Sequence, residues 1–211
     1  MTLEVELKYR AADDGPLRRL AIAPMLGRAD LGAADPVGEI DRYLDTDDGR
    51  LASARWACRL RHRRGTTRLF LKGPAVAGSG GGLHRRTELE GPATDELDPE
   101  AWPHSPAREL LDRLRDGHPL EERVRLVQRR TERTVLVDGD PIGTLTLDVV
   151  RVEADGRQRG ILHAVELELA AASQAHEALL DELDATLRTV NGLEPDDRTK
   201  LEHALDCIAD R

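Results

Sequence analysis

The sequence predicts an α+β fold that is mainly antiparallel β: an eight-stranded closed barrel around a tunnel, with a charged interior and helices packed on the outside. The first observation is the inverted alternation in Glu4-Val5-Glu6-Leu7-Lys8, where three charges share one face of a strand. The second is that later strand-like segments repeat this pattern with charges of both signs. The third is a set of short turns between consecutive segments. Because a half-buried strand normally turns its apolar face to a core, converging charged faces predict a water-filled interior.

Composition narrows the class of protein. The chain has 211 residues, 39% hydrophobic and 34% charged, which indicates a soluble globular protein with a single domain over residues 1–211. A net charge of −9, with one Phe, two Trp and two Tyr, argues against nucleic acid as a partner, because nucleic-acid surfaces need cations or stacking rings. Cys58 and Cys207 form no CxxC pair, and the sequence has neither a signal-peptide pattern nor a membrane-length apolar run. We therefore expect a cytoplasmic protein with no membrane partner.

Strand-like segments follow one another along the chain. They cover residues 2–10, 38–44, 55–63, 66–73, 84–90, 123–137, 143–152 and 160–170. Turn residues at Gly65-Thr66, Asp138-Gly139-Asp140-Pro141 and Asp155-Gly156 predict three hairpins. Consecutive hairpins indicate an antiparallel meander, and eight strands suffice to close a barrel with a small lumen.

Helical periodicity predicts helices over 16–25, 94–115, 173–190 and 197–209. Pro16 suits a first helical turn, and Ser173 is a good N-cap. If the inner face of the barrel is charged, its outer face is apolar, so these amphipathic helices should cover the outside. The glycine-rich stretch 75–82 lacks the Lys-Ser/Thr of a phosphate loop, and we interpret it as a flexible hairpin loop.

Reading each strand at period two assigns the charged faces. The inward carboxylates are then Glu4, Glu6, Glu88, Glu90, Asp148, Glu166 and Glu168, and the inward cations are Lys8, Arg59, Arg61, Arg68, Lys72 and Arg86. The phase of 123–137 stays open, because Arg129, Arg130 and Arg133 do not share one parity. Carboxylates suit Mg²⁺ or Mn²⁺, and lysines and arginines suit phosphate oxygens. A site that combines carboxylates for a metal with cations for phosphates is typical of phosphoryl or nucleotidyl transfer.

A plainer interpretation of any single strand is a sheet with a solvated, salt-bridged outer face. That interpretation accounts for Arg63 and Arg68. It does not account for Glu166 and Glu168 beside the carboxylates of the first strand, because like charges on one face repel unless something compensates them.

In their order along the chain, these motifs resemble the CYTH superfamily, also called triphosphate tunnel metalloenzymes. The resemblance starts at Glu4-x-Glu6-x-Lys8 and spans about residues 2 to 205. The further matching motifs are Tyr43-Leu44-Asp45-Thr46, Arg59-Leu60-Arg61, Leu69-Phe70-Leu71-Lys72-Gly73, Arg86-Thr87-Glu88-Leu89-Glu90, Asp148, Glu166-Leu167-Glu168 and Arg198-Thr199-Lys200-Leu201. Thr199 stands where the family has Ser.

The resemblance implies an eight-stranded tunnel barrel and a set of site residues. The implied metal ligands are Glu4, Glu6, Asp148, Glu166 and Glu168, and the implied catalytic residues are Glu4, Glu6, Lys8, Glu166 and Glu168. The implied phosphate-binding residues are Lys8, Arg59, Arg61, Lys72, Arg86, Arg130 and Lys200. Further candidates are Glu88, Glu90, Arg129 and Arg133. Tyr43 is expected to pack at the tunnel wall.

The leading hypothesis from this resemblance is a metal-dependent inorganic triphosphatase that uses Mg²⁺ or Mn²⁺, with two ions when substrate is bound. A class IV adenylate cyclase and a thiamine triphosphatase are alternatives, with Trp56 or Trp102 available for stacking. A polyphosphate- or nucleotide-binding module is the alternative without turnover. In each case the partner is a small polyanion, and a homodimer is compatible with the sequence.

Overall fold

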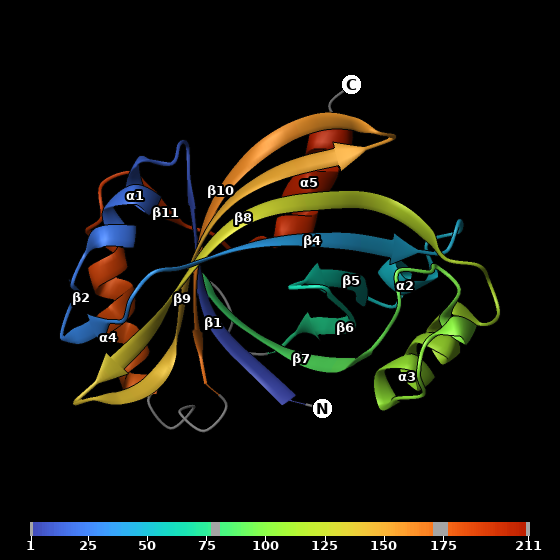
Figure 1. Ribbon diagram of the computed structural model, residues 1–211, viewed down its shortest axis with the longest axis horizontal. Helices are drawn as coiled ribbons and strands as arrows, with labels where there is room; N and C mark the ends of the chain where they lie inside the picture. The colour runs from blue at the N-terminus through green and yellow to red at the C-terminus, as the bar shows by residue number, and fades with distance from the viewer. Residues whose placement is uncertain (1, 77–80, 171–176, 210–211) are drawn as a thin grey trace.

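The computed structural model describes residues 2–76, 81–170 and 177–209, and at its centre eight antiparallel strands close into a ring (Figure 1). In order around the ring these are β8 (Glu121–Val137), β4 (Asp35–Asp45), β5 (Ala57–Arg63), β6 (Thr66–Ala75), β7 (Leu83–Pro92), β1 (Thr2–Ala11), β10 (Arg157–Leu169) and β9 (Asp140–Ala154). Strand β9 pairs again with β8, which closes the ring. The predicted eight-stranded antiparallel barrel is confirmed.

Two-residue turns join three of the hairpins. Both residues of Arg64-Gly65, of Asp138-Gly139 and of Asp155-Gly156 have positive φ, between 50° and 88°. This conformation matches the right-handed twist of the flanking strands, and glycine or aspartate adopts it readily. The three predicted hairpins are therefore present, although the first turn is centred one residue earlier than the sequence suggested.

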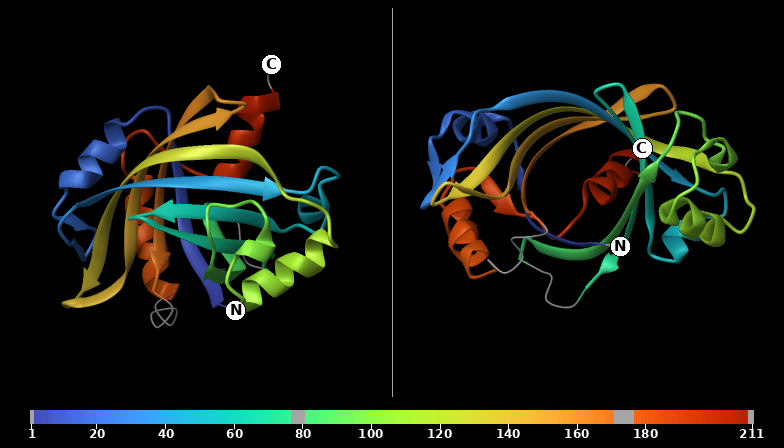
Figure 2. Two further views of the ribbon diagram at one scale, coloured as in Figure 1. Left: turned by 45° about the vertical axis from the view of Figure 1, so that its right-hand side comes forward. Right: turned by 60° about the horizontal axis from the view of Figure 1, so that its bottom comes forward.

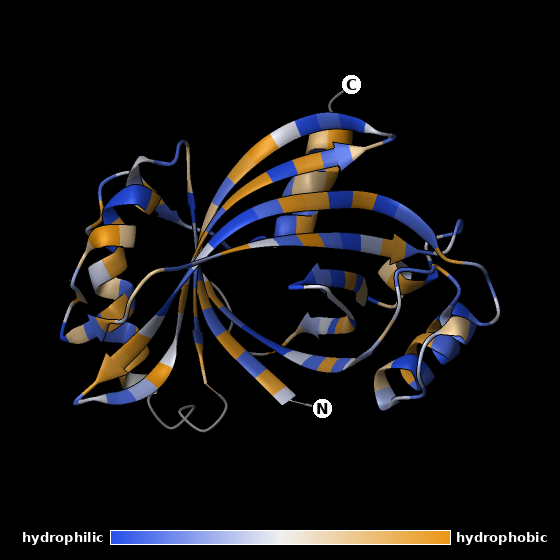
Figure 3. Ribbon diagram, viewed as in Figure 1, coloured by the Kyte–Doolittle hydropathy of each residue, from blue (hydrophilic) through white to orange (hydrophobic). Residues whose placement is uncertain are grey.

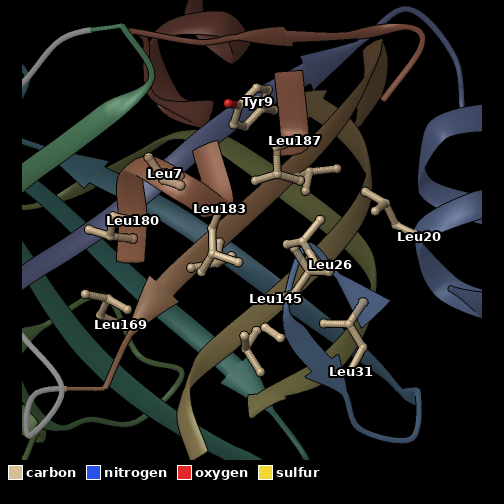
Figure 4. Close-up of a cluster of buried hydrophobic side chains, with 14 of the residues drawn as sticks. Leu7, Tyr9, Leu20, Leu26, Leu31, Leu145, Leu169, Leu180, Leu183 and Leu187 are labelled. Atoms are coloured by element: carbon tan, nitrogen blue, oxygen red, sulfur yellow. The ribbon is translucent and has the colours of Figure 1, made fainter. Parts of the chain in front are cut away.

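The outer face of the ring carries two apolar cores. Helices α1 (Gly15–Ile22) and α4 (Glu177–Arg188) cover β1, β9 and β10, and leucines such as Leu7, Leu145 and Leu183 fill the space between them (Figure 4). The short strands β2 (Met25–Leu26), β3 (Ala29–Leu31) and β11 (Leu193–Pro195) flank this core. The alternation that turns charges inward thus turns leucines outward. Along the strands, hydrophilic and hydrophobic residues alternate in bands (Figure 3).

The second outer core lies over β4, β5, β6 and β7. Helices α2 (Arg50–Ser53) and α3 (Pro106–Arg115) pack on it with the turn η1 (Pro99–Ala101), and Leu60, Leu71 and Leu111 are buried there. Only the last part of the predicted helix 94–115 is α-helical. Prolines precede it, and the Ser105 hydroxyl accepts a hydrogen bond from the Arg108 backbone N–H at its start.

Helix α5 (Lys200–Ala209) lies within the curve of the strands rather than on the outer cores (Figure 2). Its Ala204 packs with Leu126 of β8 and Val150 of β9. Leu126 has the same parity as Arg130, and Val150 the same as Asp148, so both belong to the inner face. The inner face becomes apolar toward this end of the barrel, which gives α5 a surface to pack on.

Some predicted features lie outside the described residues: the proposed N-cap Ser173 and part of the glycine-rich stretch, residues 77–80. Helix α1 ends at Ile22, two residues before Pro24, which is earlier than predicted. Among the described helices, none has the length and apolarity needed to cross a membrane.

Candidate active site

The ring encloses a cavity of about 200 Å³ whose lining is mostly charged. Side chains from seven strands and from the start of α5 reach it. The lining residues are Glu4, Glu6, Lys8, Tyr43, Ala57, Arg59, Arg61, Phe70, Lys72, Arg86, Glu88, Glu90, Arg130, Glu166, Glu168, Thr199, Lys200 and Leu201. Strand alternation explains this gathering, because every second residue of each strand points to the same interior.

Asp148 is the centre of a paired network on one side of the cavity. Arg130 donates two hydrogen bonds of 2.8 Å to its carboxylate, and Lys200 Nζ lies 2.6 Å from its Oδ2. Burial alone would raise the pKa of Asp148, but Lys200 and Arg130 lower that pKa below its ordinary value. Asp148 is fully buried and does not line the cavity, so it acts here as the counter-ion of two cations that do.

Glu166 joins this network from the neighbouring strand. Its Oε2 accepts a hydrogen bond of 2.7 Å from Lys200, and Lys8 Nζ lies 3.4 Å from its Oε1. Burial would raise the pKa of Glu166, yet Lys200, Lys8 and Arg130 hold that pKa well below its usual range. Glu166 therefore stays ionised and orders the cations around it.

A second paired network holds the arginines of β5. Arg61 donates two hydrogen bonds of 2.8 Å to Asp41, and Arg59 Nη1 lies 3.3 Å from the same carboxylate. Gln128 donates to Asp41 at 2.8 Å and to Glu39 at 2.9 Å. Asp41 is fully buried; burial would raise its pKa, and Arg59 and Arg61 lower it. This network fixes both guanidiniums at the cavity wall.

The part of the lining around Glu4, Glu6 and Glu168 has an excess of carboxylate. Lys72 Nζ lies 2.5 Å from Glu4 Oε1, and Lys8 Nζ lies 3.0 Å from Glu6 Oε1 without hydrogen-bond geometry. Among the described residues, Glu4 Oε2 and Glu6 Oε1 are buried without a hydrogen-bond partner. Glu168 lies opposite Glu6 in the β1–β10 register and is exposed to solvent. Partial enclosure by the barrel, with the charges of Glu4 and Glu6, raises the pKa of Glu168 to about 7.

This carboxylate excess is the part of the site suited to a divalent cation. Hard cations prefer oxygen ligands, and orphaned carboxylate oxygens are the atoms that such an ion would satisfy. The three carboxylates do not converge on one point as they stand. Among the described residues, the three potential ligand atoms that lie within 4.8 Å of one another belong to Asp47, Asp48 and His118 on the outer surface.

Sequence comparison decides the family. Residues 2–205 match the CYTH domain family. The chain belongs to this family. A comparison with curated proteins finds no match. Several solved structures share the CYTH tunnel fold over nearly the whole chain.

One similar structure is a Hippeastrum protein assigned as an adenylyl cyclase and described as having a dominant triphosphatase activity; it is 19% identical, with 96% of this chain and 95% of that chain covered and a TM-score of 0.64. Another is a protein from Bacillus halodurans assigned as an adenylate cyclase, 20% identical over 96% of this chain and 98% of that one, with a TM-score of 0.55. The triphosphatase of the mimivirus capping enzyme is 10% identical over 89% and 90%, with a TM-score of 0.50. At these identities the likeness concerns the fold.

The structure places most of the residues selected from sequence in one CYTH cavity, with four exceptions. Arg68, predicted to point inward, is exposed and does not line the cavity; it pairs with Glu90. Asp148 lies behind the lining, as described above. Arg129 is exposed on the outer face of β8, which settles the phase of this strand in favour of Arg130. Arg133 also points outward, where it donates hydrogen bonds to the backbone carbonyls of Leu20 and Leu31 and so fastens the segment after α1.

Sequence reasoning missed Glu39, Asp41, Gln128 and His84. The signal for the first two was present, because a period-two reading of 38–44 puts Glu39 and Asp41 on the same face as Tyr43. Gln128 follows once the phase of β8 is known. His84 begins the charged face of β7, two residues before Arg86, but a lone histidine gave no pattern to follow.

Proposed function

We propose that this CYTH protein is a divalent-metal-dependent hydrolase of triphosphate compounds and that it cleaves inorganic triphosphate to pyrophosphate and phosphate. One observation carries the proposal: a single enclosed cavity holds an under-compensated carboxylate cluster beside a wall of lysines and arginines. A linear polyanion bound with cations needs both. A site for an anion alone would not need so many buried glutamates.

Glu4, Glu6 and Glu168 would hold the metal together with Glu88, whose charge also acts on the Glu168 carboxyl. The fit rests on the orphaned oxygens of Glu4 and Glu6 and on the mutual repulsion of these carboxylates. When bound, Mg²⁺ or Mn²⁺ neutralises phosphate charge and lowers the pKa of an attacking water. We propose two ions with substrate present, and we assign Asp148 and Glu166 to holding cations in place.

The cations of the site would bind the phosphate chain. Arg59 and Arg61 stack over the Phe70 ring, with guanidinium carbons 4.8 and 5.5 Å from its centroid. Paired and stacked in this way, they are held before substrate arrives, so their charge is available to the transition state without reorganisation. Lys8, Arg130 and Lys200 are fixed in the same manner by Glu166 and Asp148.

The similar structures support the reaction class. The Hippeastrum protein is described as a dominant triphosphatase, and the mimivirus domain is a capping-enzyme triphosphatase. Both share the tunnel fold, so triphosphate chemistry is compatible with this scaffold. The two cysteines are both free, in keeping with the reducing cytoplasm that we propose as the location.

An organic triphosphate is the second candidate substrate, and one observation favours it. A hollow of about 740 Å³ adjoins the cavity through Lys72 and Arg86, and Trp56, Leu201 and Leu205 line it. A thiamine or nucleoside group could lie against these side chains, as a thiamine triphosphatase or a class IV adenylate cyclase requires. Trp102 is 2% exposed in the outer core beneath α3 and is therefore not available for stacking.

The test is a substrate panel with the full chain. Triphosphate, ATP, thiamine triphosphate and a longer polyphosphate are each incubated with Mg²⁺, Mn²⁺ or EDTA, and phosphate and cyclic AMP are measured. We expect phosphate from triphosphate with metal only, and a loss of about 100-fold or more in Glu4→Gln. The matched control is Glu194→Gln, an exposed glutamate on β11, which should behave as wild type. Tight triphosphate binding in EDTA without hydrolysis on adding metal would show a binding module instead.

A further inference from the structure

His84 lies between a backbone carbonyl and a cavity cation. It is 4% exposed, at the start of β7. Its Nε2 lies 2.8 Å from the Asp196 carbonyl oxygen, and its Nδ1 lies 3.2 Å from Arg86 Nη2. A carbonyl oxygen can only accept and a guanidinium nitrogen can only donate. Both contacts are satisfied together by one species: neutral imidazole with its proton on Nε2 and its lone pair on Nδ1.

Arg86 depends on this contact. Among the described residues, its side chain makes no other hydrogen bond, and no carboxylate lies within ion-pair distance of it. Its Nε is buried without a partner. The other cations of the lining are each held by a carboxylate, such as Asp41 for Arg61 and Asp148 for Arg130. Arg86 thus reaches the cavity without an ion-pair partner among the described residues and with its Nε donor unused. A buried guanidinium with a free donor is suited to bind an anion.

The carbonyl that holds His84 is itself fixed. The Asp196 backbone N–H donates to the Lys8 carbonyl at 2.9 Å. The Asp196 side chain is held as well, because its Oδ2 lies 2.7 Å from Nε2 of His203 on α5. One residue therefore ties together β1 at Lys8, β7 through His84, and the helix that begins with Lys200. The charged groups that face His84 are Lys8, Arg86 and Glu6. Burial, with the charge of Lys8, lowers the pKa of His84, which agrees with a neutral ring.

We propose that His84 is a positioning residue: through Nδ1 it directs the Arg86 guanidinium into the cavity, where Arg86 binds a phosphate oxygen of the substrate. The role rests on the proposed function. It links the anion-binding geometry of Arg86 to the same segment that places Lys8 and Lys200.

Two variants separate the two contacts of the ring. His84→Asn keeps an acceptor near the Nδ1 position, and His84→Gln keeps a donor that reaches the Asp196 carbonyl. We expect KM for triphosphate to rise about ten-fold or more in His84→Gln, with a much smaller change in kcat, and to stay within about three-fold of wild type in His84→Asn. The matched control is His104→Gln, an exposed histidine that pairs with Glu109. Equal KM values in His84→Gln and wild type would overturn the proposal.

A double-mutant cycle with Arg86→Ala tests whether His84 acts through Arg86. Adding His84→Gln to Arg86→Ala should raise KM no further, whereas independent contributions would multiply and contradict the proposal. Nitrogen-15 NMR of the substrate-free protein supplies a readout without activity: the His84 ring should be the neutral Nε2–H form at pH 7, and an Nδ1–H or charged ring would refute the geometry. If the wild-type protein hydrolyses no triphosphate, the proposed function is wrong, whereas the NMR measurement still tests the geometry of His84 independently.

Discussion

Arg130 and Asp148 face each other in register on β8 and β9 and share two hydrogen bonds of 2.8 Å inside the barrel. Asp148 also accepts from Lys200, so one carboxylate compensates two cations of the cavity wall. Asp148→Asn removes that charge without changing the volume. Because it breaks a buried, doubly hydrogen-bonded ion pair and leaves Glu166 as the nearest carboxylate to Lys200, we expect the free energy of unfolding to fall by about 3–5 kcal/mol in urea denaturation.

Adding triphosphate should restore part of the unfolding free energy that Asp148→Asn loses, since triphosphate brings negative charge to the same cations. Asp155→Asn in the exposed β9–β10 turn is the control and should change stability little. A loss in Asp148→Asn that triphosphate leaves untouched would separate this network from the anion site.

Arg86→Ala should weaken triphosphate binding while leaving the stability of the protein nearly unchanged. Among the described residues Arg86 makes no ion pair, so its removal breaks no charge network, and we expect the midpoint of urea unfolding to stay near that of wild type. The affinity for triphosphate, measured by calorimetry, should fall about ten-fold or more. A strongly destabilised Arg86→Ala protein with normal affinity would show that the side chain is structural.

Glu6→Gln should weaken metal binding. The Glu6 carboxylate is 3% exposed and has an orphaned oxygen on the under-compensated side of the cavity. Replacing a charged oxygen ligand with an amide should lower the affinity for Mn²⁺ roughly ten-fold or more, as measured by electron paramagnetic resonance of free Mn²⁺. Glu194→Gln again serves as the control. Unchanged Mn²⁺ affinity in Glu6→Gln would place the ion elsewhere, with the surface group of Asp47, Asp48 and His118 as the alternative site.

Alkaline pH should loosen the contact between β1 and α4. The buried Tyr9 hydroxyl donates to the Asp184 side chain, and burial together with this hydrogen bond raises the pKa of Tyr9. The folded state therefore keeps a proton that the unfolded chain releases near pH 10, so this stability is full below pH 10 and is lost as the pH rises above it. Denaturation at several pH values should show a steeper alkaline decline in wild type than in Tyr9→Phe. Equal slopes would contradict the assignment.

The sequence predicted the barrel and most of its lining for one physical reason. In Glu4-Val5-Glu6-Leu7-Lys8 and Glu166-Leu167-Glu168, period-two alternation alone says which side chains share a face, and ring closure makes those faces meet. The phase of Arg130 could not be derived in this way, because arginines occupy both parities of β8 and only the partner Asp148 distinguishes them. The position of α5 was equally hidden, since an amphipathic stripe shows that a helix packs but not on which surface.

The pairing of charges also could not be predicted from the sequence. The sequence shows how many carboxylates and cations there are but not which of them neutralise one another. Asp148 and Glu168 have similar chemistry, yet the first is held between Arg130 and Lys200 while the second stands among other glutamates. That difference depends on three-dimensional neighbours from four separate segments, and it separates the residues that order cations from those suited to a metal.

The pairing of β1 with β10 has a consequence for how the chain folds. Closing the ring includes a step that pairs residues 157–169 with residues 2–11, which lie far apart in the polypeptide. That step sets Glu6 directly opposite Glu168, and like charges so placed resist it. A divalent cation held between these two carboxylates would relieve the repulsion, and it would then favour assembly of the barrel.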